Sequence, residues 1–320
     1  MATYFITGIC GTVGKALARY ILKSHQDAEV VGVDTNETEV FFINNEFRST
    51  GRFRAYLCDI RDLNELVLRS QKADFFFHTA ALKHVPICEM SPNQAVSTNI
   101  IGTQNCIQAA KSNNVKTFIF TSSDKAVNPT NVMGSTKLVG ERLVTAAAEN
   151  NDSDCIFAST RFGNVVGSRG SVIPIFRKQI ERSEKLTITH PEMTRFVMSL
   201  DEAVSLVFKS SQIAQNGDVL VTKMPVARIL DIAQLFLEMA QRSVDEYEII
   251  GIKPGEKLFE ELNNSEEVDR TEDAADFLRI MSSNKVIRGS NGSTKEYNSA
   301  NIPPVTQSEL KALLIDWNAI

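Results

Sequence analysis

The strongest constraint on the fold is the alternation of short apolar segments with amphipathic segments along the first half of the chain. Strands are predicted for "TYFIT", "EVVGVD", "FRAYLC", "DFFFH", "KTFIF" and "CIFAST", and helices for 13–24, 91–111 and 132–149. This alternation is typical of a doubly wound parallel sheet with helices on both faces. We therefore predict an α/β fold whose ligands bind beyond the carboxyl ends of the strands.

The pattern changes after about residue 165, and a chain of 320 residues is long enough for a second lobe. Short strand candidates ("LTIT", "FVMS", "YEIIGI") stand there among longer connections, with a helix expected at 175–184, whereas 201–223 is predicted to return to the main sheet. We predict a first domain of 1–165 with 201–223, and a smaller discontinuous lobe of 166–200 with 224–320. The polar stretch 263–300 is expected to be loosely ordered or to form an arm.

Composition excludes several classes of protein. An apolar content of 43 % indicates a packed core, and a net charge of −5 argues against a nucleic-acid or anionic-membrane binder. No apolar run is long enough to span a bilayer, and the N-terminus enters a strand without a signal sequence, so we expect a cytoplasmic protein. The five cysteines and four histidines are scattered, so neither a disulfide framework nor a metal site is expected.

A glycine-rich turn separates the first predicted strand from the first helix. "TGICGTVG" places Gly8, Gly11 and Gly14 where backbone can approach a pyrophosphate at a helix N-terminus. Asp34 ends the second strand, where a carboxylate accepts hydrogen bonds from a ribose 2′-hydroxyl and repels a 2′-phosphate. This context predicts a Rossmann domain that binds NAD in preference to NADP. A plain tight turn and a solvated aspartate are the alternatives.

Other residues of the predicted cofactor site follow from their places in the sheet. Asp59 and Ile60 follow the third strand, where the adenine is expected. Ala80 and Ala81 follow the fourth strand, where the cofactor continues towards its nicotinamide. Within the glycine-rich turn, Thr12 and Val13 are also assigned to the cofactor site.

Longer motifs point to one family. The blocks "TGICGTVG", "CDIRD", "HTAALKHVP", "VSTNIIGTQN", "TSSDKAVNPTNVMGSTK", "RFGNVVGSRGSVIP", "PEMTRF" and "GIKPGEKLFEEL" occur in this order. Over about residues 3 to 263 the chain resembles the extended short-chain dehydrogenases/reductases, within them the polysaccharide-biosynthesis type of nucleotide-sugar 4,6-dehydratase. The resemblance implies NAD-dependent conversion of a nucleotide-linked N-acetylhexosamine to a 4-keto-6-deoxy sugar. UDP-N-acetylglucosamine is favoured, and a GDP-linked substrate remains open.

The same resemblance assigns the reaction chemistry to one loop. It implies that Ser123 binds the sugar hydroxyl, that Asp124 is the acid for the C6 oxygen and that Lys125 is the base for C5–H. Those roles require a raised pKa for Asp124 and a depressed pKa for Lys125. Lys137 is expected to hold the nicotinamide ribose. Met133 stands where the wider family has a tyrosine, and a thioether cannot carry a proton, so we assign it to apolar filling at the substrate.

The resemblance also implies further contacts. Lys83 and His84 are expected at the sugar or the cofactor, with a purely structural role equally open for His84. Asn99 and Thr121 are assigned to the cofactor site. For the substrate, the candidates are Asn164, Arg169, Arg195, Lys253 and Glu256. Lys253 replaces the family's usual arginine and His190 its usual aspartate.

Two other functions remain open at this point. A nucleotide-sugar 4-epimerase or reductase would use the same scaffold, and Met133 also allows a catalytically silent dinucleotide-binding protein. The resemblance further implies a homo-oligomer that associates through helices such as 91–111 and 132–149.

Overall fold

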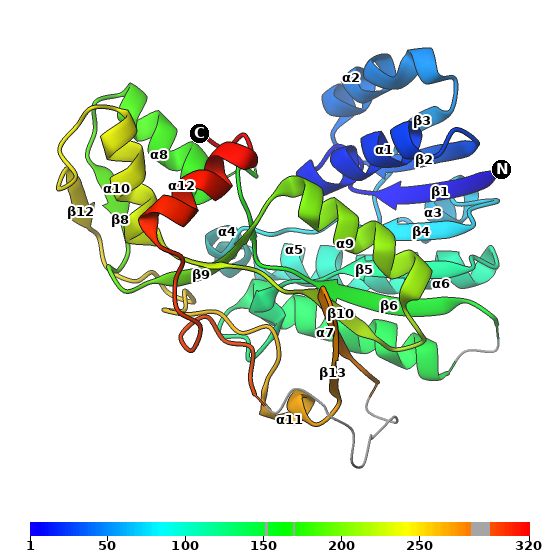
Figure 1. The fold of residues 1–320 in the computed structure, drawn as a ribbon. Coiled ribbons are helices and arrows are strands. Elements are labelled where there is room, and N and C mark those ends of the chain that lie inside the picture. Colours follow the sequence, from blue (N-terminus) through cyan, green and yellow to red (C-terminus); the bar gives the residue numbers. More distant parts are fainter. Residues whose placement is uncertain (151–152, 169, 283–294) are drawn as a thin grey trace.

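The fold is built around one large sheet. The computed structural model describes residues 1–150, 153–168, 170–282 and 295–320. Within these residues nine strands pair in the order β13-β14-β10-β6-β5-β4-β1-β2-β3 (Figure 1). Seven of them are parallel: β1 (Ala2–Thr7), β2 (Ala28–Asp34), β3 (Phe53–Leu57), β4 (Phe75–His78), β5 (Thr117–Thr121), β6 (Ile156–Arg161) and β10 (Val219–Thr222). The predicted α/β class and doubly wound parallel sheet are confirmed.

Helices cover both faces of this sheet. One face carries α1 (Thr12–Ser24), α2 (Glu37–Phe47) with the short η1 (Arg48–Thr50), and α9 (Leu200–Ile213). The other carries α3 (Leu63–Arg69), α6 (Gly102–Ser112) and α7 (Val132–Glu149). Both faces of the parallel sheet are therefore buried, which explains why its strands read as apolar runs.

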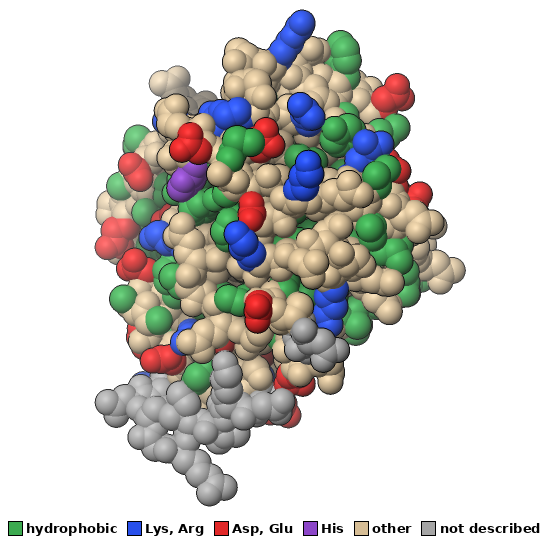
Figure 2. Space-filling view, turned by 90° about the vertical axis from the view of Figure 1, so that its right-hand side faces the viewer, with side chains coloured by type: hydrophobic (Ala, Val, Ile, Leu, Met, Phe, Trp, Pro, Cys, Tyr) green, Lys and Arg blue, Asp and Glu red, His purple; other side chains and the backbone are tan. Residues whose placement is uncertain are grey.

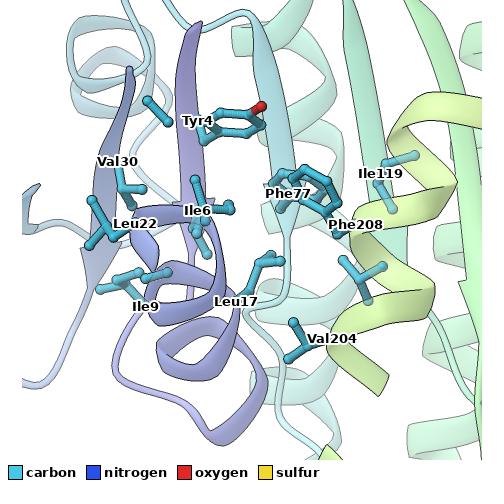
Figure 3. Close-up of a cluster of buried hydrophobic side chains, with 14 of the residues drawn as sticks. Tyr4, Ile6, Ile9, Leu17, Leu22, Val30, Phe77, Ile119, Val204 and Phe208 are labelled. Atoms are coloured by element: carbon cyan, nitrogen blue, oxygen red, sulfur yellow. The ribbon is translucent and has the colours of Figure 1, made fainter. Parts of the chain in front are cut away.

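Figure 3 shows the apolar layer on the first face. Leu17 of α1 and Phe208 of α9 point towards Tyr4 and Phe77 of the neighbouring strands β1 and β4. Leu17 and Phe77 are completely buried, and full burial of such a side chain stabilises the fold by about 1.5–3 kcal/mol. This packing holds α1, whose first turn begins the predicted cofactor site, against the sheet.

The predicted helix 91–111 is divided in the structure. It consists of α5 (Pro92–Val96), a π-helical stretch η2 (Ser97–Ile101) and α6, and it follows the short α4 (Val85–Met90). The π-helical stretch contains Asn99, whose side chain bonds both backbone groups of Leu82 and the hydroxyl of Thr136. Such stretches occur often near functional sites. Here the local widening accompanies a polar bridge from this helix to the end of β4 and to α7.

The second lobe has its own apolar cluster and lies at the upper left of Figure 1. Its helices are α8 (Val172–Glu181), α10 (Ile229–Met239) and α12 (Gln307–Asp316). A parallel pair joins β8 (Leu186–Ile188) to β12 (Tyr247–Ile249), and a three-stranded sheet joins β11 (Val226–Arg228), β9 (Thr194–Met198) and β7 (Asn164–Val165). β7 follows the end of β6 after two residues, and the end of β9 pairs with it, so this lobe lies next to the carboxyl ends of the parallel strands.

The polar stretch 263–300 differs from the expected loose arm where it is described. It forms α11 (Ser265–Val268) and a hairpin of β13 (Thr271–Ala274) and β14 (Phe277–Ile280), which adds antiparallel to β10. This hairpin extends the main sheet, although the sequence analysis placed 224–320 in the second lobe. Apolar side chains at alternate positions explain the pairing, because Leu278 and Ile280 enter the core next to Val219 and Val221.

A buried ion-pair network fastens this late segment to the main sheet. The guanidinium of Arg161, at the end of β6, bonds Glu141 of α7 at 2.8 and 2.6 Å and Glu267 of α11 at 2.7 and 2.8 Å. It also donates to the carbonyl of Leu262 at 3.0 Å. Since all three charged side chains are almost completely buried, each charge depends on the others for compensation.

The molecular surface at the amino-terminal ends of the main-sheet strands carries mixed charges. Figure 2 shows the face at the amino-terminal ends of the strands, with basic, acidic and apolar side chains interspersed over it. Within the described ranges, no helix combines the length and the apolar character required to cross a bilayer.

Candidate functional site

The glycine-rich turn packs directly on the end of β4. Gly8 has a φ of +69°, and a Cβ atom there would lie 2.8 Å from the Cα atom of Ala80. The positive φ and the lack of space for a Cβ atom together require glycine at this position. β1 and β4 are neighbours in the sheet while β2 and β5 lie on opposite sides of them, so this contact marks the topological switch point where ligands bind.

A first cavity, of about 500 Å³, opens at this switch point. Its lining includes predicted cofactor residues from four strand ends: Gly8, Gly11, Asp34, Asp59, Ile60, Ala80 and Ala81. Asp34 accepts hydrogen bonds from the backbone N–H groups of Cys10 at 3.0 Å and Asn36 at 3.1 Å. Its carboxylate is thus held at the rim with acceptor capacity remaining for a ribose hydroxyl.

One cation also lines this first cavity. Arg61 is paired with Asp59, with Nη2 and Oδ2 2.5 Å apart, and it donates to the side chain of Gln94 at 3.1 Å. Its guanidinium is therefore engaged by a carboxylate of the same cavity. The sequence analysis did not assign this arginine to the cofactor site, because it lies 27 residues after Asp34 in the chain.

A second cavity, of about 520 Å³, continues from the first. It shares Gly11, Ala81 and Leu82 with it and adds the start of α1 and the loop after β5. The predicted residues that it brings together are Thr12, Val13, Gly14, Lys83, His84, Thr121, Ser123, Lys125, Met133, Lys137 and Asn164. Buried Asn99 lies behind this cavity and acts on it only by holding Leu82 and Thr136.

Lys137 is fixed inside the second cavity. Its Nζ donates to the carbonyl of Thr121 at 2.9 Å and lies 4.7 Å from the centre of the Phe120 ring. Burial lowers the pKa of Lys137 to about 8, against the opposing charge of Glu141. Met133, one helical turn earlier on α7, is buried against Cys88 and Ala95, so it contributes an apolar wall on the same face.

A third cavity, of about 440 Å³, lies between the two lobes. It shares His84, Lys125, Asn164 and Ser171 with the second cavity, so the three form a continuous channel. The predicted residues Arg195, Lys253 and Glu256 line it, and Arg169 lies outside the described residues. The hydroxyl oxygen of Ser171, at the start of α8, is buried and has no hydrogen-bond partner within the described part of the chain. That hydroxyl is available to a ligand.

The loop after β5 carries the predicted reaction residues to the junction of the second and third cavities. The hydroxyl of Ser123 lies 2.5 Å from Oδ1 of Asp124, and Nζ of Lys125 lies 3.1 Å from both carboxylate oxygens. α7 approaches this loop closely, since a Cβ atom on Gly134 would lie 2.2 Å from the carbonyl oxygen of Lys125. The fold thus brings the three predicted residues together as one hydrogen-bonded group.

Glu260 completes this group and was missed in the sequence. Its Oε1 lies 3.1 Å from Nζ of Lys125 and 3.2 Å from Nε of Arg195, and its side chain is 4 % exposed. Its other oxygen is buried and has no hydrogen-bond partner within the described residues, and the neighbouring carboxylate of Asp124 acts on this carboxyl. Glu260 lies at the end of the quoted block "GIKPGEKLFEEL", but nothing in that block distinguishes it from Glu261.

The pKa shifts of Asp124 and Lys125 are opposite to those predicted. Burial alone would raise the pKa of Asp124, but Lys125 and the hydrogen bonds outweigh it and lower that pKa. Burial alone would lower the pKa of Lys125, but Asp124 and Glu260 raise it. The predicted directions were therefore wrong for the ligand-free protein. Burial and the neighbouring charge of Asp124 instead raise the pKa of Glu260, to about 7.

Arg195 is held by the protein rather than free for a ligand. Each of its five N–H groups faces a partner: Glu260, the carbonyls of Thr194, Leu258 and Lys257, and the sulfur of Met193. A diphosphate would have to displace one of these partners. Lys253 lines the third cavity and is exposed to solvent. His190 accepts a hydrogen bond from the backbone of Glu192 in a surface turn.

Metal ligands do not cluster in the described ranges: no group of three or more His, Cys, Asp or Glu side chains is arranged to hold an ion. The chemistry that these residues can perform is proton transfer and hydrogen bonding next to a dinucleotide-sized channel.

The fold and the channel define a class of protein, the short-chain dehydrogenase/reductase-like fold of nucleotide-sugar dehydratases and epimerases. Within it, the chain belongs to the polysaccharide biosynthesis protein family, whose model matches residues 4–282. The family resemblance found in the sequence is thereby confirmed at this level.

Curated relatives carry several names. The chain is 40 % identical over 319 residues to an uncharacterized membrane protein of Methanocaldococcus jannaschii, covering 98 % of this chain and 95 % of that one. It is 37 % identical to a UDP-glucose 4-epimerase of Rickettsia bellii, covering 99 % and 96 %. It is 38 % identical to the capsular polysaccharide biosynthesis protein CapD of Staphylococcus aureus, covering 83 % of this chain but only 46 % of that protein.

Solved structures agree on the fold. Pen from Bacillus thuringiensis matches with a TM-score of 0.94 and 37 % identity, covering 100 % of this chain and 98 % of that one. DesIV, a dTDP-glucose 4,6-dehydratase of Streptomyces venezuelae solved with NAD, matches with a TM-score of 0.72 and 18 % identity, covering 80 % and 86 %. At that identity the second match speaks for the fold alone.

Proposed function

We propose that the protein catalyses the NAD-dependent 4,6-dehydration of a nucleotide-linked N-acetylhexosamine, with UDP-N-acetylglucosamine as the favoured substrate. The observation that carries this proposal is the group of Ser123, Asp124 and Lys125 at the junction of the dinucleotide channel with the third cavity. An oxidation needs only one proton acceptor beside the sugar. An elimination needs an acid and a base as well, and this group supplies both.

The residues of the first two cavities fit NAD. The N-terminus of α1 lines the second cavity and has no side-chain cap at Gly11, so its N–H groups suit a pyrophosphate. Asp34 would accept a hydrogen bond from a ribose hydroxyl. When bound, the cofactor accepts a hydride from C4 of the sugar and returns it to C6. Lys137 and the Thr121 carbonyl would orient the nicotinamide end, and buried Met133 would exclude water from it.

The resting group holds the acid and the base in ionised form. Lys125 is an ammonium and Asp124 a carboxylate, 3.1 Å apart. Transfer of one proton from Nζ to Asp124 produces a neutral amine, which removes the C5 proton, and a carboxylic acid, which protonates the C6 oxygen as water leaves. The pKa directions seen without ligand are therefore those of the resting state of this pair.

A nucleotide-sugar 4-epimerase is the second candidate. It is supported by the UDP-glucose 4-epimerase name of relatives that match nearly the whole chain at 37 % identity. Such an enzyme has no use for an acid at the C6 oxygen, and Met133 offers no proton acceptor at the position where the tyrosine would stand.

One experiment separates these activities. The protein is incubated with UDP-N-acetylglucosamine and NAD⁺ in D₂O, and the nucleotide sugar is analysed by mass spectrometry and by NMR. We expect loss of one water and gain of one deuterium at C5. Unchanged mass with an inverted C4 would replace the proposal by epimerisation, and no change with either UDP- or GDP-linked N-acetylhexosamine would refute both.

A further inference from the structure

A balanced turnover needs a second proton acceptor beside Asp124. This argument depends on the proposed dehydration. The proton that leaves O4 must be taken up before C5–H is broken, and Lys125 must become neutral to break it. If Asp124 alone held the O4 proton, the ammonium of Lys125 would have nowhere to place its own. A single carboxylate therefore cannot serve both steps.

The structure offers one carboxyl group in the right place. Glu260 reaches Nζ of Lys125 at 3.1 Å through Oε1. Its Oε2 is buried and lacks a hydrogen-bond partner within the described residues. The charge of Asp124 acts on the Glu260 carboxyl, so the two carboxyls are neighbours in the group. The hydroxyl of Ser123 donates to Oδ1 of Asp124 at 2.5 Å. Ser123, Asp124, Lys125 and Glu260 thus form one connected group, in which the ammonium of Lys125 bridges the two carboxylates.

We infer that Glu260 stores the substrate's O4 proton during each turnover and returns it to Lys125 at the end. Glu260 acts on the sugar through its neighbours Asp124 and Lys125. It is therefore a positioning residue and does not itself contact the reacting atoms. No tyrosine is required in this arrangement, since the second carboxyl takes over the storage of the proton.

The proton inventory closes over one cycle. The O4 proton passes through Ser123 and Asp124 to ionised Glu260 while the hydride leaves C4. Lys125 then gives a proton to Asp124, the C6–O bond breaks with that proton leaving as water, and Lys125 takes the C5 proton. After the hydride has returned to C6, Lys125 reprotonates C5, and Glu260 returns its proton to Lys125. The sugar has lost one water, and all three side chains are as they began.

The electrostatics of the pocket suit this storage. The charged groups that act on Glu260 are Asp124 and Lys125 from the loop after β5 and Arg195 from β9. Burial and Asp124 raise the pKa of Glu260 to about 7, against the opposing effects of the two cations. A group that titrates near neutral pH accepts and releases a proton with little cost in either direction.

Protonation of the Glu260 carboxyl can be observed without substrate. Infrared spectra of the holoenzyme are recorded as the pH is raised through about 7. We expect the band of a protonated carboxyl to disappear over this range in the wild type and in the control Glu261→Gln, and to be absent from Glu260→Gln. Glu261 is a suitable control because it is adjacent in the chain but is not itself a lining residue of the channel, although its partner Lys257 lines the third cavity. A wild-type spectrum without the band, or a band that survives Glu260→Gln, would overturn the inference.

Single-turnover kinetics test the storage itself. Glu260→Gln should still reduce NAD⁺ with UDP-N-acetylglucosamine, because Asp124 accepts the first proton. The reduced cofactor should then persist, with elimination at least ~10²-fold slower. In Glu260→Gln, the decrease of kcat at acidic pH near the pKa of Glu260 should vanish. Glu260→Asp should restore part of the elimination rate and part of this pH dependence. The storage role would be contradicted if Glu260→Gln eliminated water at the wild-type rate. It would also be contradicted if this variant lost cofactor reduction and elimination to the same extent. If the wild type itself yields no dehydrated sugar, the proposed function fails, and the infrared result still decides the protonation of Glu260.

Discussion

The ammonium of Lys125 lies 3.1 Å from each carboxylate oxygen of Asp124, its immediate neighbour in the chain. The Asp124 side chain is completely buried, whereas that of Lys125 is 30 % exposed to the channel. Each therefore depends on the other for its ionised form, and a change at either residue should affect a different step of the reaction.

For Asp124→Asn, we expect no accumulation of reduced cofactor, because the amide cannot accept the O4 proton. Lys125→Ala should still reduce the cofactor but should not eliminate water. Each change should cost at least the ~10²–10⁴-fold typical of a lost general acid or base. Single-turnover absorbance of the reduced cofactor locates each block. Normal cofactor reduction by Asp124→Asn would show that another group takes the first proton.

For Met133→Leu, we expect kcat within a few-fold of the wild type. Met133 is 3 % exposed and packs against Cys88 and Ala95, so a side chain of similar volume preserves the wall of the channel. Steady-state rates of Met133→Leu and Asp124→Asn, measured side by side, test the prediction. Comparable damage in both variants would assign a chemical role to the thioether.

We expect NAD⁺ to bind at least ~10-fold more tightly than NADP⁺ because of Asp34. A 2′-phosphate beside this carboxylate meets a repulsion on the order of 4 kcal/mol before screening. Arg61, a cation that lines the same cavity, is already paired with Asp59. Dissociation constants of both cofactors for the wild type and for Asp34→Asn provide the measurement, and the variant should lose most of the discrimination. Equal affinities in the wild type would mean that Arg61 reaches the phosphate.

Replacement of Arg161 by Leu should lower the free energy of unfolding by about 3–5 kcal/mol. The change leaves Glu141 and Glu267 buried, each without its cation. Lys223→Leu is the matched control: it removes an exposed pair with Asp273, which contributes at most about 1 kcal/mol. Urea denaturation measures both. A similar small loss for the two variants would show that α11 holds its place by other contacts.

His78 should make the protein sensitive to mild acid. Its ring is completely buried between the hydroxyls of Thr7 and Thr103, and burial lowers its pKa from 6.5 to about 3. The unfolded chain therefore binds a proton that the native protein does not, and stability falls as the pH drops from about 6.5 towards 3. This residue should contribute up to about 1.4 kcal/mol per pH unit to that loss. Denaturation midpoints of His78→Gln across this range should show a shallower decline, and parallel curves would refute the assignment.

The cofactor half of the site was predictable because its residues follow consecutive strands. In a parallel sheet the carboxyl ends of strands meet at one edge, so Gly8, Asp34, Asp59 and Ala80 had to converge once the alternation was recognised. The same reasoning placed Ser123 to Lys125 after β5. Their individual roles remain predictions, as do the boundaries of the two lobes.

The substrate half depends on contacts that no local pattern encodes. Glu260 meets Lys125 across 135 residues, and it lies in the described segment between β12 and α11, which forms no helix or strand. The pKa directions of Asp124 and Lys125 could not be derived from their types, because they are set by each other and by Glu260. Arg195 resembled a phosphate ligand by residue type, but the carbonyls that occupy its donors come from the tertiary fold.

The separation of Lys125 from Glu260 also has a consequence for how the protein is made. A ribosome adds about 5–20 residues per second, so roughly 7–27 s pass between synthesis of the loop and synthesis of its partner. In that interval a nascent chain already contains every strand end of the cofactor cavity, but the ammonium and carboxylate of the loop still lack the second carboxyl, that of Glu260. Chemical competence is thus gained late in translation.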